Sequence, residues 1–426
     1  MSQTKPVRTD GQLSHLPKDS AVPTEMPSIE TSYSWIRLLV SITLSTLGCV
    51  GLWSLAVALP AVQADFGVQR AGASLPYALT MVGFMIGGIT VGRFADRFGI
   101  LAPFAGGTIL MCLGYILTAY APTLPAFAII SGLTIGLGSA ASFAPLVADA
   151  SLWFDRHRGF AISLATIGSS LSGVVWPPII QHFIAQVGWR HTHIGIGIFC
   201  MATMLPLALV LRRRPVFHKP ITEAASAGNA REAIGLPPNA AHALLTLAGL
   251  CCCVAMAMPQ VHLVAYCADL GYGPARGAGM LAVMLGFGVA SRLIFGWVFS
   301  RIGGLRTLLL GSVMQAVALA LYLPFDGLVS LYVISATFGL AQGGLVPSYA
   351  VIIRELFPAR QAGLRVSLAI STTLAGMALG GWLAGAIYDW SGSYAAALIN
   401  GIGWNMVNMV IVIWLLQRSR RSGALR

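Results

Sequence analysis

Long runs of apolar residues, separated by short polar intervals, recur along the whole chain. Apolar runs of about 18 residues or more are typical of helices that span a membrane. Only 9% of the 426 residues are charged, whereas soluble domains carry about 25%. Lipid offers no partner to backbone N–H and C=O groups, so helices are the structure that such runs form there. The sequence therefore predicts an all-α membrane protein.

The apolar runs predict twelve transmembrane helices, with both termini on one side of the membrane. The expected spans are 37–61, 74–95, 101–120, 125–149, 160–186, 192–211, 242–267, 277–299, 305–323, 328–352, 365–388 and 394–416. Lys and Arg concentrate on the cytoplasmic side of membrane proteins. Of the 26 Lys and Arg residues, all but Arg70, Arg190, Arg276 and Arg292 fall on the side of the termini. We therefore expect a multi-pass membrane protein with cytoplasmic termini. Its expected location is the plasma membrane, with a bacterial inner membrane favoured. No nucleic-acid partner is expected.

The longest polar interval between spans divides the chain into two parts. We expect residues 213–241 to be a cytoplasmic linker between six-helix halves at 33–212 and 242–417. The flanking segments, 1–32 and 418–426, are expected to be a disordered cytoplasmic tail and a basic cytoplasmic tail.

The two halves share similar loops, which indicates an internal duplication. The stretch Gly92–Gly99 after the second span matches Gly296–Gly303 after the eighth, at an offset of 204 residues. The stretch Trp153–Gly159 likewise matches Leu356–Gly363, at an offset of 203 or 204. Such repeats are typical of secondary transporters, whose substrate site lies near the middle of the membrane between the halves.

The loop Gly92-x-x-x-Asp96-Arg97-x-Gly99 resembles that between helices two and three of the major facilitator superfamily. The resemblance implies a pseudo-symmetric twelve-helix fold and a gating cluster at the inner ends of the helices. That cluster would contain Asp96, Arg97, Asp149 and Arg156, with Arg97 or Arg156 as the partner of Asp149, and Glu355 at the matching place in the second half. The alternative for these residues is a set of solvated boundary charges.

Three segments resemble the monocarboxylate porters and oxalate–formate-type exchangers of that superfamily. They are Trp153–Ala161, the run Pro259-x-x-His262-Leu263-Val264-x-Tyr266-x-x-Asp269-x-Gly271, and the helix-eight segment Ser291–Gly296. The family has an arginine within the membrane in helix eight, and here the matching residue is Arg292. One difference is Gly288, which replaces an acidic residue often found one turn before that arginine.

Arg292 is the candidate for substrate binding because it lies in the middle of a span. Nine residues separate it from Arg301 at the inner end, which is ~13 Å at ~1.5 Å per residue and close to half of a ~30 Å hydrocarbon core. A charge there costs ~2.5–3.5 kcal/mol on insertion scales. The guanidinium fits a carboxylate in a bidentate manner. The alternative is a structural pair with a buried acid, although no Asp or Glu lies in the middle of a span.

His262 and Tyr266 lie one turn apart on the seventh span and are further candidates for substrate binding. His262 could bind the anion or relay a proton, and Tyr266 would line the same path. The alternatives are a hydrogen-bonded core histidine and an aromatic at the membrane interface. In the fifth span, Pro177 and Pro178 are expected to kink the helix, because proline removes a backbone donor.

These features predict a secondary transporter and no enzyme or cofactor. The sequence has no P-loop and no metal-type spacing of Cys and His. The expected substrate is a small organic anion, with a monocarboxylate as the favoured class, moved by alternating access through proton-linked symport or anion exchange. The alternatives are a carrier of drugs or neutral solutes with the same fold, and a membrane sensor or assembly factor that transports nothing.

Overall fold

The chain forms helices throughout the part that the computed structural model describes, residues 30–154, 157–213 and 234–421. Eleven helical segments in this part are long and apolar enough to cross a membrane, so the prediction of an all-α membrane protein is confirmed. The elements of the first part are α1 (Ser32–Gly48), η1 (Cys49–Leu52), α2 (Ser54–Phe66), α3 (Arg70–Phe98), α4 (Leu101–Ala119), α5 (Leu124–Ile130), η2 (Ser131–Gly136), α6 (Leu137–Ser139), η3 (Ala140–Ser142), α7 (Ala144–Trp153), α8 (Arg158–Ala208) and η4 (Leu209–Arg212). Those of the second are α10 (Pro238–Asp269), α11 (Pro274–Ile302), α12 (Gly304–Leu321), α13 (Leu328–Gln342), α14 (Leu345–Leu356), α15 (Ala359–Ser391) and α16 (Tyr394–Arg421).

The expected tails and linker lie mostly outside the described residues. This holds for nearly all of 1–32 and for 214–233 within the expected linker. At the other end of the chain, α16 continues to Arg421, so the start of the expected basic tail at 418–426 is helical.

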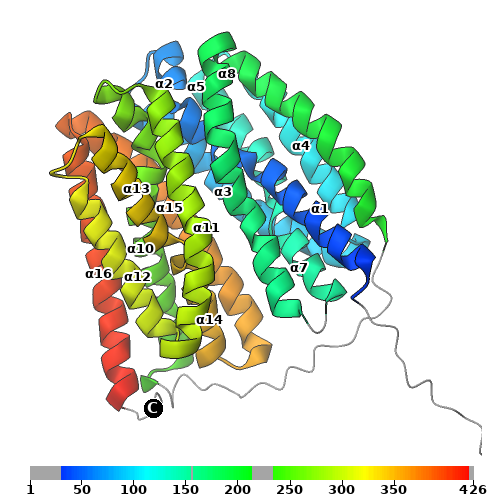
Figure 1. Cartoon of the computed structure of the whole chain (residues 1–426), viewed down its shortest axis with the longest axis vertical. Helices are drawn as coiled ribbons and strands as arrows, with labels where there is room; N and C mark the ends of the chain where they lie inside the picture. The colour runs from blue at the N-terminus through cyan, green and yellow to red at the C-terminus, as the bar shows by residue number, and fades with distance from the viewer. Residues whose placement is uncertain (1–29, 155–156, 214–233, 422–426) are drawn as a thin grey trace, which may run out of the picture.

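The 51-residue helix α8 contains both the fifth and the sixth expected spans. A straight helix of that length would extend for roughly 77 Å at ~1.5 Å per residue, more than twice the ~30 Å hydrocarbon core. Gly188 interrupts it with φ 80° and ψ 163°, a conformation that glycine adopts because it has no Cβ. Figure 1 shows the two limbs of α8 running in the same direction away from a shared bend.

Three of the membrane-length segments are broken near their middle. The first span is interrupted by η1, the fourth by η2 to η3, and the tenth by Gly343 and Gly344 between α13 and α14. Irregular backbone at membrane depth is tolerated where protein buries it or where it lines a cavity. Cys49, Ala140 and both glycines of the tenth span are buried, so these breaks lie inside the protein.

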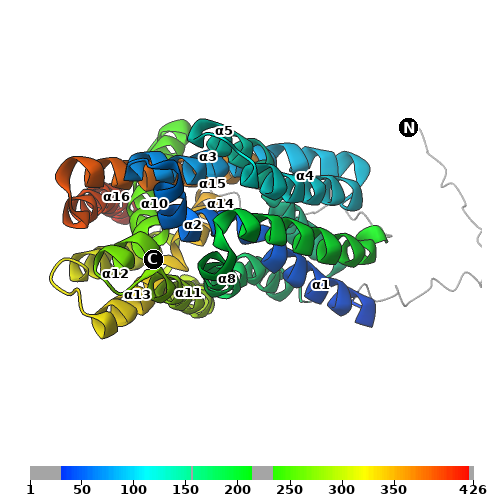
Figure 2. The ribbon, with the colours of Figure 1, turned by 90° about the horizontal axis from the view of Figure 1, so that it is seen from above.

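The helices form two bundles that meet along a few helices. Helices α1 to α8 pack mainly with one another, and so do α10 to α16. Across the boundary α3 packs against α15, α8 against α11, and α2 against α10. Figures 1 and 2 show α1 and α4 on one side and α12 and α16 on the other. In Figure 1 the start of α1 and the end of α16 lie at the same end of the molecule, which we call the terminal end, and the opposite one the far end.

Glycines allow close packing within the first bundle. A Cβ added to Gly83 of α3 would overlap the carbonyl oxygen of Gly132, and one added to Gly87 would meet the carbonyl oxygen of Leu137 at 2.5 Å. Small residues at helix contacts let backbones approach closely in membranes. Gly92 of the same helix has no atom within 4 Å of an added Cβ.

We expect Gly83→Ala to destabilise the protein by about 1–3 kcal/mol, because a backbone atom must move to admit the methyl group. Gly92→Ala is the matched control on the same helix, where the added methyl group meets open space. Thermal unfolding of the purified proteins in detergent measures the difference. Equal melting temperatures for the two variants would contradict the packing role of Gly83.

Candidate functional site

Arg292 lies on α11 at the boundary between the two bundles. Its Nη1 donates a hydrogen bond of 3.0 Å to the backbone carbonyl oxygen of Thr166 on α8. Among the described residues, no carboxylate forms an ion pair with Arg292. A carbonyl oxygen carries only a partial negative charge, so the positive charge of the guanidinium is solvated but not neutralised.

Two of the broken helices lie beside Arg292. The carbonyl of Thr166 that binds Arg292 lies two residues before Gly168, whose carbonyl oxygen accepts a 3.2 Å hydrogen bond from Thr46 of α1, three residues before η1. One residue before Arg292, the hydroxyl of Ser291 donates to the carbonyl oxygen of Leu340 at 2.6 Å. Gly343 and Gly344 at the break of the tenth span pack directly on α11. The local backbone therefore brings polar groups and irregular structure to the depth of Arg292.

A pair of buried glutamines lies next to the same face of α11. The amide nitrogen of Gln260 on α10 donates to the amide oxygen of Gln342 at the end of α13. Gln342 Nε2 lies 3.6 Å from the position of a Cβ added to Gly288, one turn before Arg292. Gln342 thus fills space next to the position where the resembling porters often have an acidic residue.

His262 is fully buried and both of its ring nitrogens have partners. Nε2 lies 2.8 Å from the carbonyl oxygen of Gly381 on α15, so Nε2 must carry the proton and donate it. Nδ1 lies 3.2 Å from the hydroxyl of Tyr394, and in this tautomer the hydroxyl donates to Nδ1. This arrangement matches the alternative of a hydrogen-bonded core histidine, and the substrate-binding role of His262 stays a prediction.

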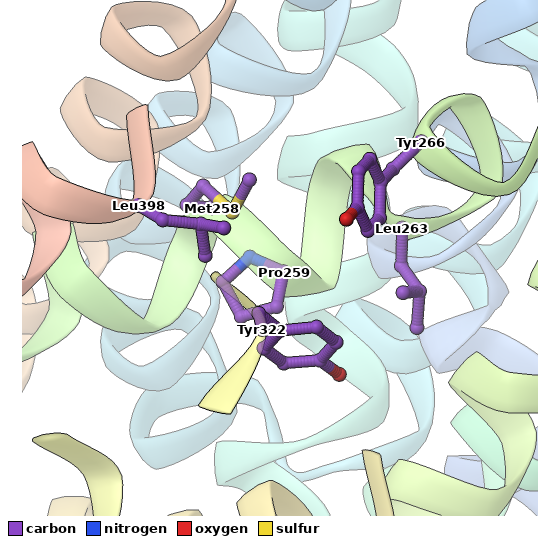
Figure 3. Close-up of a pocket in the computed structure, with 6 residues that line it drawn as sticks. All are labelled: Met258, Pro259, Leu263, Tyr266, Tyr322 and Leu398. Carbon is purple, nitrogen blue, oxygen red and sulfur yellow. The ribbon is translucent and has the colours of Figure 1, made fainter. Parts of the chain in front are cut away.

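Tyr266 lies one turn after His262 and contacts the same neighbour, with ring centroids of Tyr266 and Tyr394 5.4 Å apart. It also lines a small apolar cavity of about 10 Å³ with side chains from α10, the end of α12 and α16, drawn in Figure 3. That volume admits roughly one water molecule, so it is too small for an organic anion. The structure brings His262 and Tyr266 together, but no contact among the described residues joins them to Arg292.

Asp149 has a different partner from the one that the family resemblance implied. Its carboxylate forms a bidentate ion pair with Arg37 of α1, at 2.7 Å to Nε and 2.8 Å to Nη2. Both side chains are buried, at 2% and 6% exposure. Arg37 was not the expected partner, and because Arg156 lies outside the described residues, a contact of Asp149 with Arg97 or Arg156 stays a prediction.

Arg37 also binds the end of the sixth expected span. Its guanidinium donates to the backbone carbonyl oxygens of Val210, Leu211 and Arg213. Cations at the carbonyl end of a helix complement its dipole and satisfy its last acceptors. Arg37 was not among the residues predicted from the sequence. It lies at the start of the first span, where a basic residue indicates only which side of the membrane that end faces.

Of the remaining gating candidates, the structure describes the side chains of Arg97 and Glu355, which have different neighbours. Arg97 is exposed and lies over the ring of Phe98. Glu355, at the end of α14, lies against the start of α12, where its Oε2 would be 3.0 Å from a Cβ added to Gly304. Arg156 and the side chain of Asp96 lie outside the described residues. The gating role of all five residues stays a prediction.

Pro177 and Pro178 lie within α8, whose one non-helical residue in the described part is Gly188. The indole N–H of the preceding residue, Trp176, donates to the carbonyl oxygen of Thr46 at 2.9 Å and fixes this stretch against α1. A kink at the two prolines stays a prediction.

Comparison with known proteins gives a consistent family. Residues 42–339 and 293–425 match the family model described as Major Facilitator Superfamily. The chain is 27% identical to Monocarboxylate transporter 13 of Bos taurus over 334 residues, which is 77% of this chain and 75% of the relative. The protein of the same name from Rattus norvegicus is 27% identical over 330 residues, with the same coverage.

Solved structures share the fold at low sequence identity. A mutant of the peptide transporter POT superimposes with a TM-score of 0.72 at 14% identity, covering 91% of this chain and 95% of the other. A bacterial homologue of the human lysosomal transporter Spinster gives a TM-score of 0.67 at 15% identity, covering 92% and 96%.

We expect Asp149→Ala to destabilise the protein by about 3–5 kcal/mol, because it leaves the Arg37 guanidinium buried without a counter-charge. The double variant Arg37→Met with Asp149→Leu should recover most of that loss, since apolar residues of similar size replace both charges. Thermal unfolding in detergent is the measurement. A stable Asp149→Ala protein that has lost transport would instead assign the pair to gating.

Proposed function

The chain belongs to the Major Facilitator Superfamily and is a membrane transporter of its monocarboxylate-porter-like branch, and on that premise we propose that it carries a small organic anion by alternating access. A monocarboxylate is the favoured class of substrate. The observation that supports this proposal is the unneutralised guanidinium of Arg292 at the boundary between the bundles.

A bound carboxylate would supply the charge that Arg292 lacks. Placing an unpaired cation at membrane depth costs a few kcal/mol, and a bidentate carboxylate offsets that cost while forming two charge-assisted hydrogen bonds. The site also suits alternating access, because Arg292 belongs to one bundle and its present partner, the carbonyl of Thr166, to the other. When the bundles rock, this contact must lengthen or be exchanged for a contact with the substrate.

In the proposed topology, the chain crosses the membrane twelve times and forms two six-helix halves. We propose that α8 crosses twice, with its bend at Gly188 on the outer side. An even number of crossings agrees with the position of the start of α1 and the end of α16 at one end of the molecule (Figure 1). The excess of Lys and Arg on the side of the termini supports a cytoplasmic position for that end.

Anion exchange is the mode of coupling that the site favours over proton symport. Two described carboxylates near the membrane boundaries, Asp149 and Asp269, are held in ion pairs with arginines. His262 in its neutral form has both nitrogens occupied, so taking up a proton would break the bond from Tyr394. A second anion returning in the opposite direction requires no such group.

A carrier of neutral or drug-like solutes is the alternative function. The buried Gln260–Gln342 pair supports it, since amides bind neutral polar groups as well as anions. Uptake of radiolabelled lactate, pyruvate, oxalate and tricarboxylates into proteoliposomes, with and without a pH gradient, tests the proposal. No uptake of any of these carboxylates by protein that is correctly inserted in the membrane would reject the organic anion.

Arg292→Ala should lower carboxylate uptake by about a hundredfold, corresponding to ~2.7 kcal/mol, within the range for truncating one partner of a buried charge pair. Arg292→Lys keeps the charge but loses the bidentate geometry, and should keep part of the activity. Initial uptake rates are compared at equal amounts of protein in the membrane. Wild-type rates for Arg292→Ala would refute the assignment.

Gly288→Asp should raise the KM for the anion about tenfold or more, because it places a carboxylate one turn from Arg292 that competes with substrate. An added Cβ meets its nearest atoms, of Gln342 and Gly339, at 3.6 and 3.7 Å, so the residue fits. Gly288→Asn is the control, with the same shape and no charge. If both variants change KM equally, the effect is steric and does not act through Arg292.

A further inference from the structure

At the far end of the molecule, an arginine at the start of α3 crosses to the second bundle. Nη2 of Arg70 lies 2.6 and 2.8 Å from the two carboxylate oxygens of Asp269, the last residue of α10. The guanidinium also lies over the rings of Tyr388 and Tyr394, at 4.8 and 5.6 Å from their centroids. Arg70 is only 7% exposed, whereas the Asp269 side chain is 32% exposed, so the ion pair lies at the edge of the protein with its arginine turned inward.

A second carboxylate from the same bundle caps the N-terminus of α3. The two oxygens of Asp389 on α15 accept hydrogen bonds of 2.8 Å each from the backbone N–H groups of Arg70 and Ala71. The N-cap residue of α3 itself, Gln69, makes no side-chain cap bond. The first N–H groups of a helix need external acceptors, and a carboxylate is favoured there by the helix dipole. Here the opposite bundle supplies that acceptor.

The sequence of α15 provides the close approach that this cap requires. Gly385 lies one turn before Asp389, and a Cβ added to it would lie 2.9 Å from the carbonyl oxygen of Arg70 and 3.0 Å from the N–H nitrogen of Ala71. One turn earlier, Gly381 faces the ring of Tyr77 on α3, at 3.0 Å from an added Cβ. Residues four apart share a helix face, so α15 presents two glycines and one carboxylate to α3.

At two glycines that the structure describes toward the terminal end of the same helices, no such contact is found. An added Cβ at Gly92 of α3 or Gly363 of α15 would have no atom within 4 Å. Phe94 and Leu364, near those positions, are 55% and 70% exposed. Contact between α3 and α15 is thus concentrated at the far end.

We propose that Arg70, Asp269 and Asp389 form a lock that closes the far side of the transporter, with Asp389 acting as an N-cap supplied to α3 by the opposite half. To open that side, α3 must leave α15, which breaks the ion pair and removes both backbone acceptors together. The lock rests on the proposed alternating-access function, because only a carrier whose halves separate at this end has to break it.

His262 contributes to this lock as a positioning residue. It joins the carbonyl of Gly381 on α15 to the hydroxyl of Tyr394 on α16, and Tyr394 in turn lies beneath the Arg70 guanidinium. His262 therefore fixes α15, which carries the Asp389 acceptor of the two N–H groups, relative to Tyr394 beneath the Arg70 guanidinium.

Solvent access from outside the cell tests the lock directly. Leu285 on α11 is 5% exposed and lies against Gly173 of α8 between the bundles, so Leu285→Cys reports on the far side. Labelling by a membrane-impermeant maleimide is followed in whole cells, with the protein lacking Leu285→Cys as the background for its buried native cysteines.

Adding Asp389→Ala should raise the labelling rate about tenfold, as the closed population falls. Gly385→Ala should also raise the labelling rate, because its methyl group pushes α15 from α3 while all charges stay in place. If Asp389→Ala does not reach the membrane, the labelling rate of Gly385→Ala tests the lock. The matched control is Asp65→Ala, which breaks the 2.8 Å ion pair with Arg190 at the same end but within one bundle. Labelling rates for both lock variants equal to that of the Asp65→Ala control would overturn the proposal.

The labelling experiment tests the lock independently of which substrate the protein carries. Labelling is measured without any solute, so a carrier that fails to transport carboxylates can still show the lock. Carboxylate uptake that depends on Arg292, together with unchanged labelling in both variants, would reject the lock and leave the proposed function standing.

Discussion

A buried charge in a membrane protein is costly unless a counter-charge or a ligand neutralises it. Three arginines of this chain differ in the groups that surround their charge. Arg37 is held by Asp149 within one bundle, and Arg70 by Asp269 across the two bundles. Arg292 has a backbone carbonyl where the others have a carboxylate. The paired arginines hold helices together, whereas the unpaired one retains the charge with which an anion can be bound.

The helix backbone is irregular near the depth of Arg292. Three membrane-length segments break near their middle, and the break of the tenth span packs directly on the helix of Arg292. Each break packs against helices of its own bundle, so its irregular carbonyl and N–H groups lie within protein instead of in lipid. Regular helices would supply an apolar wall at this depth, which would raise the energy of any bound carboxylate.

Much of the architecture could be predicted from the sequence, because hydropathy acts locally. The apolar runs located the membrane-length helices, and the lone Arg292 in the middle of one of them identified the candidate site. The partners of the charged residues could not be predicted in this way. Arg37 and Asp149 are 112 residues apart, and their meeting depends on how α1 and α7 rotate about their axes. For His262, periodicity indicated the face of its helix but not the carbonyl and hydroxyl that occupy both nitrogens.

The carboxylate of Asp389 also makes the local stability of one helix depend on the distance between two halves of the protein. While the halves touch, the first N–H groups of α3 are bonded to it. In the open state that we propose, those amides would have water as their acceptor, and the first turn of α3 would be free to fray. The rate of hydrogen exchange at the amides of Arg70 and Ala71 would therefore report the opening of the far side, without any attached probe.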